Sequence, residues 1–306
     1  MPVYSNDSSG TIAVLIRHRD RAEIVIDAPA KVNLFLQVLN RRPDGFHSIN
    51  SLFQAVSLYD RLRFRSLPTP EVIIHLLTDV PLPVNEDNLI ARAYNSLRRR
   101  FDLKLGLEVW LEKNVPIAAG LGGGSSDGAA TLMTCNLLCD IGLSDDDLRS
   151  LGAEIGSDVP FFFSNGQALV SGRGEILTET SFPTDYSMVL ATPNVSVSTQ
   201  SAYAGLQRSL TTSADEYKLS RCRTVEQFVH ELSFTDNDFE QSAFQTYPEL
   251  EVLRRALLRI GAQLVRMTGS GPTMFGIFER APRVEEDRQL TRGDWQVHVV
   301  RPISLA

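Results

Sequence analysis

The chain carries the stretch Pro116-Ile117-Ala118-Ala119-Gly120-Leu121-Gly122-Gly123-Gly124-Ser125-Ser126-Asp127-Gly128-Ala129-Ala130, a glycine-rich turn that leads into an apolar, helix-spaced segment ending near Cys139. Its glycines let the backbone adopt positive φ values and lie directly against a ligand. The unpaired N–H groups and partial positive charge at the start of the next helix favour an anion. Ser125, Ser126 and Asp127 are candidate N-cap residues. We therefore expect a phosphate-binding loop; the alternative is a flexible turn before a capped helix.

Two common phosphate-binding motifs do not fit this stretch. No Gly-Lys-Ser/Thr follows the glycines, as a Walker loop requires. No acidic residue follows at the place that a dinucleotide-binding strand-turn-helix needs. A different kind of phosphate loop is indicated.

Length and composition indicate a globular protein with a large core. The chain has 306 residues, of which 43% are hydrophobic, so one or two domains are expected. A formal charge of −7 argues against a protein that coats nucleic acid or an anionic membrane. The three cysteines fit reduced thiols, and we expect a cytoplasmic protein. No apolar run reaches the roughly 18 residues of a membrane span, and residues 1–21 are interpreted as an extension without a signal peptide.

Apolar periodicity predicts an α+β chain with a change of character after Pro193. Strands are predicted at residues 23–28, 31–39, 49–56, 61–66, 72–77, 105–113, 167–171, 188–192, 263–267, 273–279 and 295–300. Helices are predicted after the glycine loop and at residues 88–101, 144–155, 198–210, 225–232, 239–246 and 248–260. We expect one domain over residues 1–190 and a second over residues 191–306.

Two ionisable residues stand out beside the loop. Lys31 and Asn33 share one face of a predicted strand, whereas Val32 and Leu34 point into the core. Taken alone, Lys31 could be a surface cation with a buried stem. Asp158, after Gly156 at the start of a short helix, could equally be an N-cap.

The order of the motifs resembles the GHMP kinase superfamily. The resemblance rests on Ala28-Pro29-Ala30-Lys31-Val32-Asn33-Leu34, the glycine loop, Gly156-Ser157-Asp158-Val159-Pro160 and Thr268-Gly269-Ser270-Gly271. Three further stretches are similar to the branch that acts on a cytidine-diphosphate-linked methylerythritol: Arg42-Pro43-Asp44-Gly45-Phe46-His47, Glu86-Asp87-Asn88-Leu89 and Gly172-Arg173-Gly174-Glu175-Ile176-Leu177. The match runs from about residue 24 to the end. It implies a two-domain α+β fold, with a ribosomal-S5-like N-terminal domain, a ferredoxin-like C-terminal domain and the active site in the cleft between them.

The resemblance also implies a reaction, the ATP-dependent phosphorylation of the 2-hydroxyl of that substrate in non-mevalonate isoprenoid biosynthesis. Asp158 matches the family's general base, which takes the hydroxyl proton. Lys31 would orient Asp158 and stabilise the charge of the moving phosphoryl group. Because strong mutual effects need close approach, we expect the Lys31 ammonium within about 5 Å of the Asp158 carboxylate.

By resemblance, the loop from Pro116 to Ser126 binds the phosphates of ATP through backbone N–H groups. Ser125 is the candidate contact with phosphate or Mg²⁺. Asn88 and Lys113 match the adenine pocket, although they could instead be a helix-start residue and an exposed cation at a strand end.

For the substrate, Phe46 and His47 at a hairpin tip and Tyr203 from the second domain are expected to stack on cytosine, with His47 reading its edge. The alternative is an aromatic core at the loop tip. Thr199 and Asn33 are expected at the diphosphate or erythritol end. The family commonly has tyrosine where Phe46 stands and phenylalanine where Tyr203 stands. In this chain the phenolic hydroxyl is therefore at position 203 instead of position 46.

Two departures concern the loop. Ala118-Ala119 stand where the family often has glycines, and Asp127-Gly128 stand where Asn-Ala is usual. The charge of Asp127 would weaken ATP binding unless the side chain turns away, caps the helix or helps to hold Mg²⁺.

Three alternatives remain open: a related kinase for mevalonate or homoserine, a non-catalytic ligand-binding protein of this fold, and a nucleic-acid binder. The leading interpretation is a monomer or weak homodimer that needs ATP, Mg²⁺ and a small cytidylyl substrate, without nucleic-acid or membrane partners.

Overall fold

The computed structural model describes residues 15–19, 23–78, 81–206, 218–291 and 294–305. Most of the extension, residues 1–14 and 20–21, therefore lies outside the described residues, as does the end of the helix predicted at residues 198–210. The short strand β1 (Leu15–Arg19) falls within the extension and pairs with β2, which the sequence interpretation missed. Among the described residues, no helix has the length and hydropathy needed to cross a membrane.

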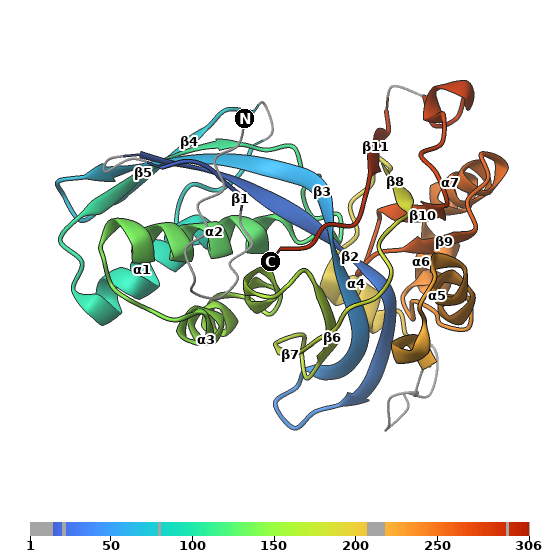
Figure 1. Cartoon of the computed structure of the whole chain (residues 1–306), viewed down its shortest axis with the longest axis horizontal. Helices are drawn as coiled ribbons and strands as arrows, with labels where there is room; N and C mark the ends of the chain where they lie inside the picture. Colours follow the sequence, from blue (N-terminus) through green and yellow to red (C-terminus); the bar gives the residue numbers. More distant parts are fainter. Residues whose placement is uncertain (1–14, 20–22, 79–80, 207–217, 292–293, 306) are drawn as a thin grey trace.

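The first layer is a seven-stranded sheet with helices on one face (Figure 1). Its main strand order is β1-β2-β3-β5-β4, and β6 extends it by pairing with β3 and with β7. The other strands are β2 (Glu23–Arg41), β3 (His47–Leu67), β4 (Val72–Leu76), β5 (Gly106–Glu112), β6 (Gln167–Ser171) and β7 (Ile176–Glu179). The helices on its inner face are α1 (Leu89–Phe101), α2 (Gly123–Leu138) and α3 (Asp145–Ile155). A 3₁₀ helix, η1 (Val159–Phe163), follows α3.

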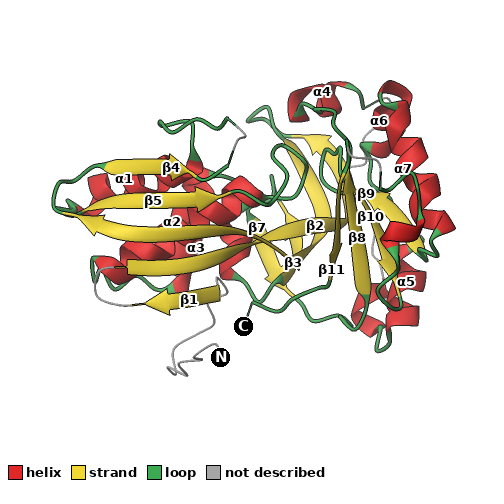
Figure 2. Cartoon of the chain, turned by 90° about the horizontal axis from the view of Figure 1, so that it is seen from above, coloured by secondary structure: helices red, strands yellow, loops and turns green. Residues whose placement is uncertain are grey.

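The strands β2 and β3 are each continuous, and the prediction of two shorter strands in each place was wrong. Register shifts between Pro29 and Ala30 and between Asn33 and Phe35 bend the pair without ending it. A bulge of this kind adds a residue on one strand, breaks the alternation of apolar side chains and increases the twist. In Figure 2 the two strands run from the first sheet to the second, so they join the two halves of the molecule.

The second layer is the antiparallel sheet β11-β8-β10-β9. Its strands are β8 (Ser187–Thr192), β9 (Leu264–Met267), β10 (Met274–Phe278) and β11 (Gln296–Val300). The helices of this half are α4 (Thr199–Ala204), α5 (Val225–Leu232), α6 (Glu240–Thr246) and α7 (Pro248–Arg259), with 3₁₀ turns η2 (Lys218–Arg221) and η3 (Val284–Glu286). Alternation along β10 places Phe275 and Met274 in two different apolar clusters, the first with Phe228 of α5 and the second with Leu253 of α7.

The boundary between domains stays a prediction. Residue 190 falls inside β8, which belongs to the second sheet. The last residues return to the first layer, where Ile303 N–H donates to the Ala55 carbonyl (3.0 Å) and Leu305 is buried.

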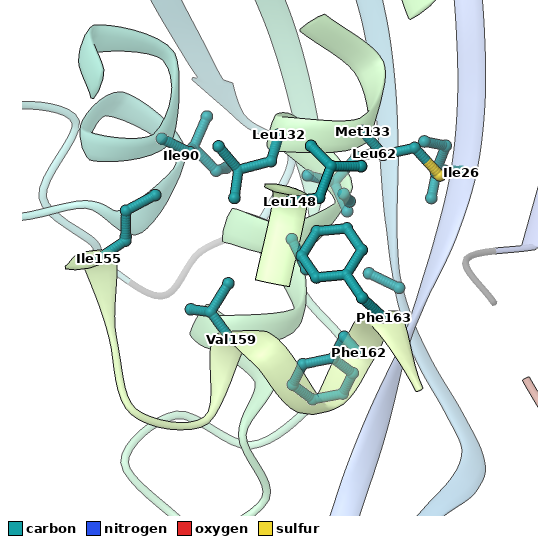
Figure 3. Packing of buried hydrophobic residues seen from close by; sticks show 14 of the residues in the cluster. Ile26, Leu62, Ile90, Leu132, Met133, Leu148, Ile155, Val159, Phe162 and Phe163 are labelled. Atoms are coloured by element: carbon teal, nitrogen blue, oxygen red, sulfur yellow. The ribbon is translucent and has the colours of Figure 1, made fainter. Parts of the chain in front are cut away.

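The helix that follows the glycine loop is fixed by packing on nearly all sides. In Figure 3, side chains of α2, α3 and η1 gather against the first sheet; they include Leu132, Met133, Leu148, Phe162 and Phe163. Leu132 and Leu148 have no exposed surface. Truncating such a leucine to alanine costs about 2–5 kcal/mol, so this core holds the start of α2 in a fixed place.

Candidate active site

The glycine loop connects β5 to α2 and forms the entrance to the helix. Gly122 is the N-cap, with φ 69°, and no side chain caps the first turn. The prediction that Ser125, Ser126 or Asp127 caps the helix was wrong, because all three lie within the helix, after its N-cap. The first N–H groups of α2 therefore stay available to a ligand.

Close packing against the loop at residues 268–271 explains why a glycine stands at position 120. Gly120 has φ 77°, and a Cβ there would lie 2.2 Å from the Thr268 carbonyl oxygen. Thr268 Oγ1 lies 3.2 Å from the Gly120 carbonyl oxygen and 2.9 Å from the Asn33 backbone nitrogen, which donates to it. The motif at residues 268–271 thus joins the glycine loop to β2.

The loop lines a cavity of about 300 Å³. All the predicted nucleotide-binding residues except Ser126 line it: Pro116, Ile117, Ala118, Ala119, Gly120, Leu121, Gly122, Gly123, Gly124, Ser125, Asn88 and Lys113. Ser126 is fully buried in the structure. Leu82, Leu89 and Leu111 add an apolar wall, which suits the flat face of a base.

Asn88 and Lys113 have structural roles beside this cavity. Asn88 is the N-cap of α1, because its Oδ1 accepts the Ile90 N–H (2.9 Å). Lys113 is not an exposed cation: its side chain is 5% exposed and lies between the carboxylates of Asp60 and Asp127. Burial alone would lower the pKa of Lys113, but Asp127 and Asp60 outweigh it and raise that pKa.

Asp127 does not face the cavity as a free charge. Its Oδ2 accepts from the Lys113 ammonium at 2.9 Å. Burial raises the pKa of Asp127 to about 7, with the nearby Asp60 acting in the same direction and Lys113 opposing both. The negative charge of Asp127, which the sequence analysis expected near the phosphates, is therefore partly offset by Lys113.

The two residues expected to do the chemistry meet, although they are 127 positions apart in the sequence. Lys31 Nζ lies 3.2 Å from Asp158 Oδ2, within the expected range. The Lys31 side chain is 4% exposed, which excludes the surface cation, whereas that of Asp158 is 30% exposed. The lysine is enclosed and the carboxylate is accessible.

Lys31 is held on three further sides. Its ammonium donates to Asn33 Oδ1 (2.7 Å) and lies 4.5 Å from the centre of the Phe53 ring. Its backbone N–H donates to the Leu121 carbonyl (2.9 Å), which ties it to the glycine loop. Asn33 thus holds Lys31, a role that the sequence analysis missed.

Asp158 stands at the start of η1, yet its side chain makes no capping hydrogen bond. A Cβ on Gly174 would lie 3.7 Å from Asp158 Oδ1, so the turn at residues 172–174 passes beside the carboxylate. Ser125 Oγ lies 3.9 Å from the Cβ position of Gly156. The turn at residues 172–174 and the glycine loop therefore both lie next to the segment at residues 156–158 that carries Asp158.

Two of the predicted substrate residues, His47 and Tyr203, pack against each other, and the charge of Asp158 acts on Tyr203. His47 stacks on Tyr203 with ring centres 5.0 Å apart and planes 12° apart. Burial, and secondarily the charge of Asp158, raises the pKa of Tyr203. Phe46 is 56% exposed, which excludes an aromatic core at the loop tip, and the Arg173 guanidinium lies 5.1 Å from its ring centre. Thr199 Oγ1 lies 3.1 Å from Ser270 Oγ.

Comparison with known proteins identifies the family. Residues 88–166 match the GHMP kinases N-terminal domain and residues 218–289 match the GHMP kinases C-terminal domain. The 4-diphosphocytidyl-2-C-methyl-D-erythritol kinase of Geobacillus kaustophilus is 37% identical over 88% of this chain and 92% of its own length. The enzyme of the same name from Exiguobacterium sibiricum is 37% identical over 91% and 97%. The chain belongs to the 4-diphosphocytidyl-2-C-methyl-D-erythritol kinases.

Solved structures agree with this kinase family. A crystal structure of 4-(cytidine 5'-diphospho)-2C-methyl-D-erythritol kinase superposes with a TM-score of 0.73 at 30% identity, covering 91% of this chain and 99% of the other. Homoserine kinase from Cytophaga hutchinsonii reaches the same TM-score at 19% identity, which shows a shared fold alone. The two-domain GHMP fold is confirmed, and so is the expectation of a small-molecule kinase that uses ATP.

Proposed function

We propose that this kinase transfers the γ-phosphoryl group of ATP to the 2-hydroxyl of 4-(cytidine 5'-diphospho)-2-C-methyl-D-erythritol, giving the 2-phosphate and ADP in non-mevalonate isoprenoid biosynthesis. The observation that carries the proposal is the Lys31–Asp158 pair, 3.2 Å apart beside the glycine-lined cavity. The names of the relatives, at 37% identity over most of the chain, support the choice of substrate.

Asp158 would act as the general base. Its accessible carboxylate takes the proton as the substrate O–H bond breaks and the new O–P bond forms. The bond from the γ-phosphorus to its bridging oxygen breaks at the same time, and ADP leaves. Lys31 keeps the carboxylate in place and offsets negative charge on the transferred group.

The loop would hold the triphosphate through the N–H groups of residues 120–125, which need no lysine of their own. Oxygen ligands suit Mg²⁺, and Ser125 offers one beside Gly156. The described residues contain no group of three acidic, histidine or cysteine side chains that could hold a metal. We therefore infer that Mg²⁺ would be carried mainly by the phosphates, with Ser125 contributing, and would supply neutralisation of phosphate charge.

His47, Tyr203 and Phe46 would bind the cytidine end, with Thr199 and Asn33 towards the diphosphate or erythritol. Because optimal contact between rings is about 3.5–4 Å, a base between His47 and Tyr203 needs about 7–8 Å, more than the 5.0 Å present. One ring must move, or the base stacks on an outer face. Mevalonate and homoserine carry no base, so they leave these aromatic residues without a role.

The remaining expectations stay predictions. The three free cysteines support a reducing compartment, and we place the kinase in the cytoplasm on that ground. We keep a monomer or weak homodimer as the predicted assembly.

ADP release tests the proposal, measured with the cytidylyl substrate and with mevalonate and homoserine. The wild type should be active with the first alone. Asp158→Asn should lose roughly 10²–10⁴-fold in kcat. The control is Asp146→Asn, which changes a carboxylate that is 90% exposed on α3 and should leave kcat unchanged. Activity of Asp158→Asn near that of the wild type would contradict the role of the base.

A further inference from the structure

Three buried charged side chains form a chain directly beneath the glycine loop. The ammonium of Lys113 donates to one carboxylate oxygen of Asp127 (2.9 Å) and to one of Asp60. The other oxygen of Asp60 accepts the backbone N–H groups of Asn114 (2.7 Å) and Val115 (2.8 Å). The side chains of Lys113, Asp127 and Asp60 are only 5%, 4% and 0% exposed. Burial of this kind is tolerated only when the charges are paired.

These residues come from both ends of the loop and from the sheet beneath it. Lys113, Asn114 and Val115 directly precede Pro116, where the loop begins. Asp127 is the fifth residue of α2, just beyond the first turn of the helix into which the loop leads. Gly123 lets the two ends approach, because a Cβ there would lie 2.9 Å from Lys113 Nζ and 3.1 Å from Asp60 Oδ2.

We propose that Asp60, Lys113 and Asp127 form a loop clamp that fixes the spacing between the two ends of the glycine loop and so positions its N–H groups for the triphosphate. Asp60 and Lys113 are then positioning residues for ATP binding. The proposal rests on the nucleotide binding inferred above and adds Asp60, which no recognised motif contains.

The action of the clamp is indirect. Lys113 and Asp127 border the cavity, but the ammonium is engaged by carboxylates on both sides. An ammonium already paired with two carboxylates has little positive charge left to offer a triphosphate in direct contact. Their contribution is therefore the geometry of the backbone above them.

Asp60→Asn tests the clamp, because asparagine keeps an oxygen for the N–H groups of residues 114 and 115 but loses the charge that pairs with Lys113. We expect KM for ATP to rise about tenfold, with kcat and KM for the cytidylyl substrate within about twofold. Without any ligand, amide hydrogen exchange in peptides covering residues 113–127 should accelerate about tenfold.

The matched control is Asp27→Asn. Asp27 is also a buried carboxylate, on the adjacent strand β2, and is paired with Arg17 (2.6 Å) and Arg61 (2.9 Å). This variant should lower Tm comparably but leave KM for ATP and exchange at residues 113–127 unchanged. Equal effects in both variants, or no effect of Asp60→Asn on KM for ATP and exchange, would overturn the clamp. If exchange is faster in Asp60→Asn but not in Asp27→Asn, and the wild type releases no ADP with the cytidylyl substrate, the clamp is retained and the proposed function is overturned.

Discussion

The site has two halves of different construction. The nucleotide half, residues 113–127 with Lys31, is made from backbone and from side chains whose charged groups are buried and paired. The substrate half, made by Phe46, His47, Thr199 and Tyr203, uses a hairpin tip and a six-residue helix, with two rings stacked on each other where a base is expected. The nucleotide half is thus preorganised, whereas the two stacked rings of the proposed substrate half leave no room for a base between them.

After Asp158→Asn, the largest expected effect concerns Lys31, in the nucleotide half. Lys31→Met keeps the stem but removes the ammonium beside Asp158, so kcat should fall roughly 10²–10³-fold. Tm should fall little, because the accessible Asp158 can be solvated by water. Steady-state ADP release and thermal unfolding measure both. Lys104→Met, at a side chain 78% exposed, is the control, and a loss of less than tenfold in Lys31→Met would show that the ammonium is dispensable.

The pH dependence of stability tests Glu240, a carboxyl that contacts the residue preceding the loop at residues 268–271. Glu240 Oε1 accepts the Met267 N–H (2.6 Å), next to the loop that contacts Gly120, and burial raises the pKa of Glu240 to about 7. A carboxyl with a raised pKa in the folded state binds its proton more tightly there than in the unfolded chain. Stability is therefore lost as pH rises from about 4.5 to 7, by roughly 3 kcal/mol for this group.

Glu240→Gln should remove that share of the pH dependence, as measured by urea unfolding at pH 5 and pH 8. Asp127 has a shift of the same sign, so some slope should remain. Glu154→Gln, at a side chain 61% exposed on α3, should unfold with the pH dependence of the wild type. An unaltered slope in Glu240→Gln would exclude Glu240 as its source.

Removing the His47 ring tests whether the two halves of the site bind their ligands independently. His47→Ala should raise KM for the cytidylyl substrate about tenfold and leave KM for ATP unchanged, since stacking contributes roughly 1–3 kcal/mol per base. His75→Ala is the control, because His75 stacks on Trp110 in the first sheet, outside the residues that form the site. A rise in KM for ATP as well would mean that the halves are coupled through Asp158.

Local signals explain what the sequence predicted. The glycine loop, the helix start at Asn88 and the Lys31–Asp158 pair each rest on short motifs, and the structure confirms the helices and the pairing. The continuity of β2 and β3 depends on bulges that interrupt side-chain alternation without ending the ladder, so the pattern predicted breaks. The partnership of Asp60 with Lys113 joins positions 53 residues apart with no motif at Asp60, and only the folded chain brings them together.

The smallest expected effect lies within the loop. Ala118 has φ 52°, a left-handed conformation that costs a residue with a Cβ about 1–2 kcal/mol. Ala118→Gly removes that cost but adds about 0.5–1 kcal/mol of backbone entropy, so the free energy of unfolding should rise by up to about 1 kcal/mol. The adjacent Ala119 is 2% exposed and has no positive φ, so Ala119→Gly should destabilise the protein instead. Equal destabilisation by the two variants would show that the strain at Ala118 contributes nothing. Opposite signs would show that Ala118 carries backbone strain that a glycine relieves.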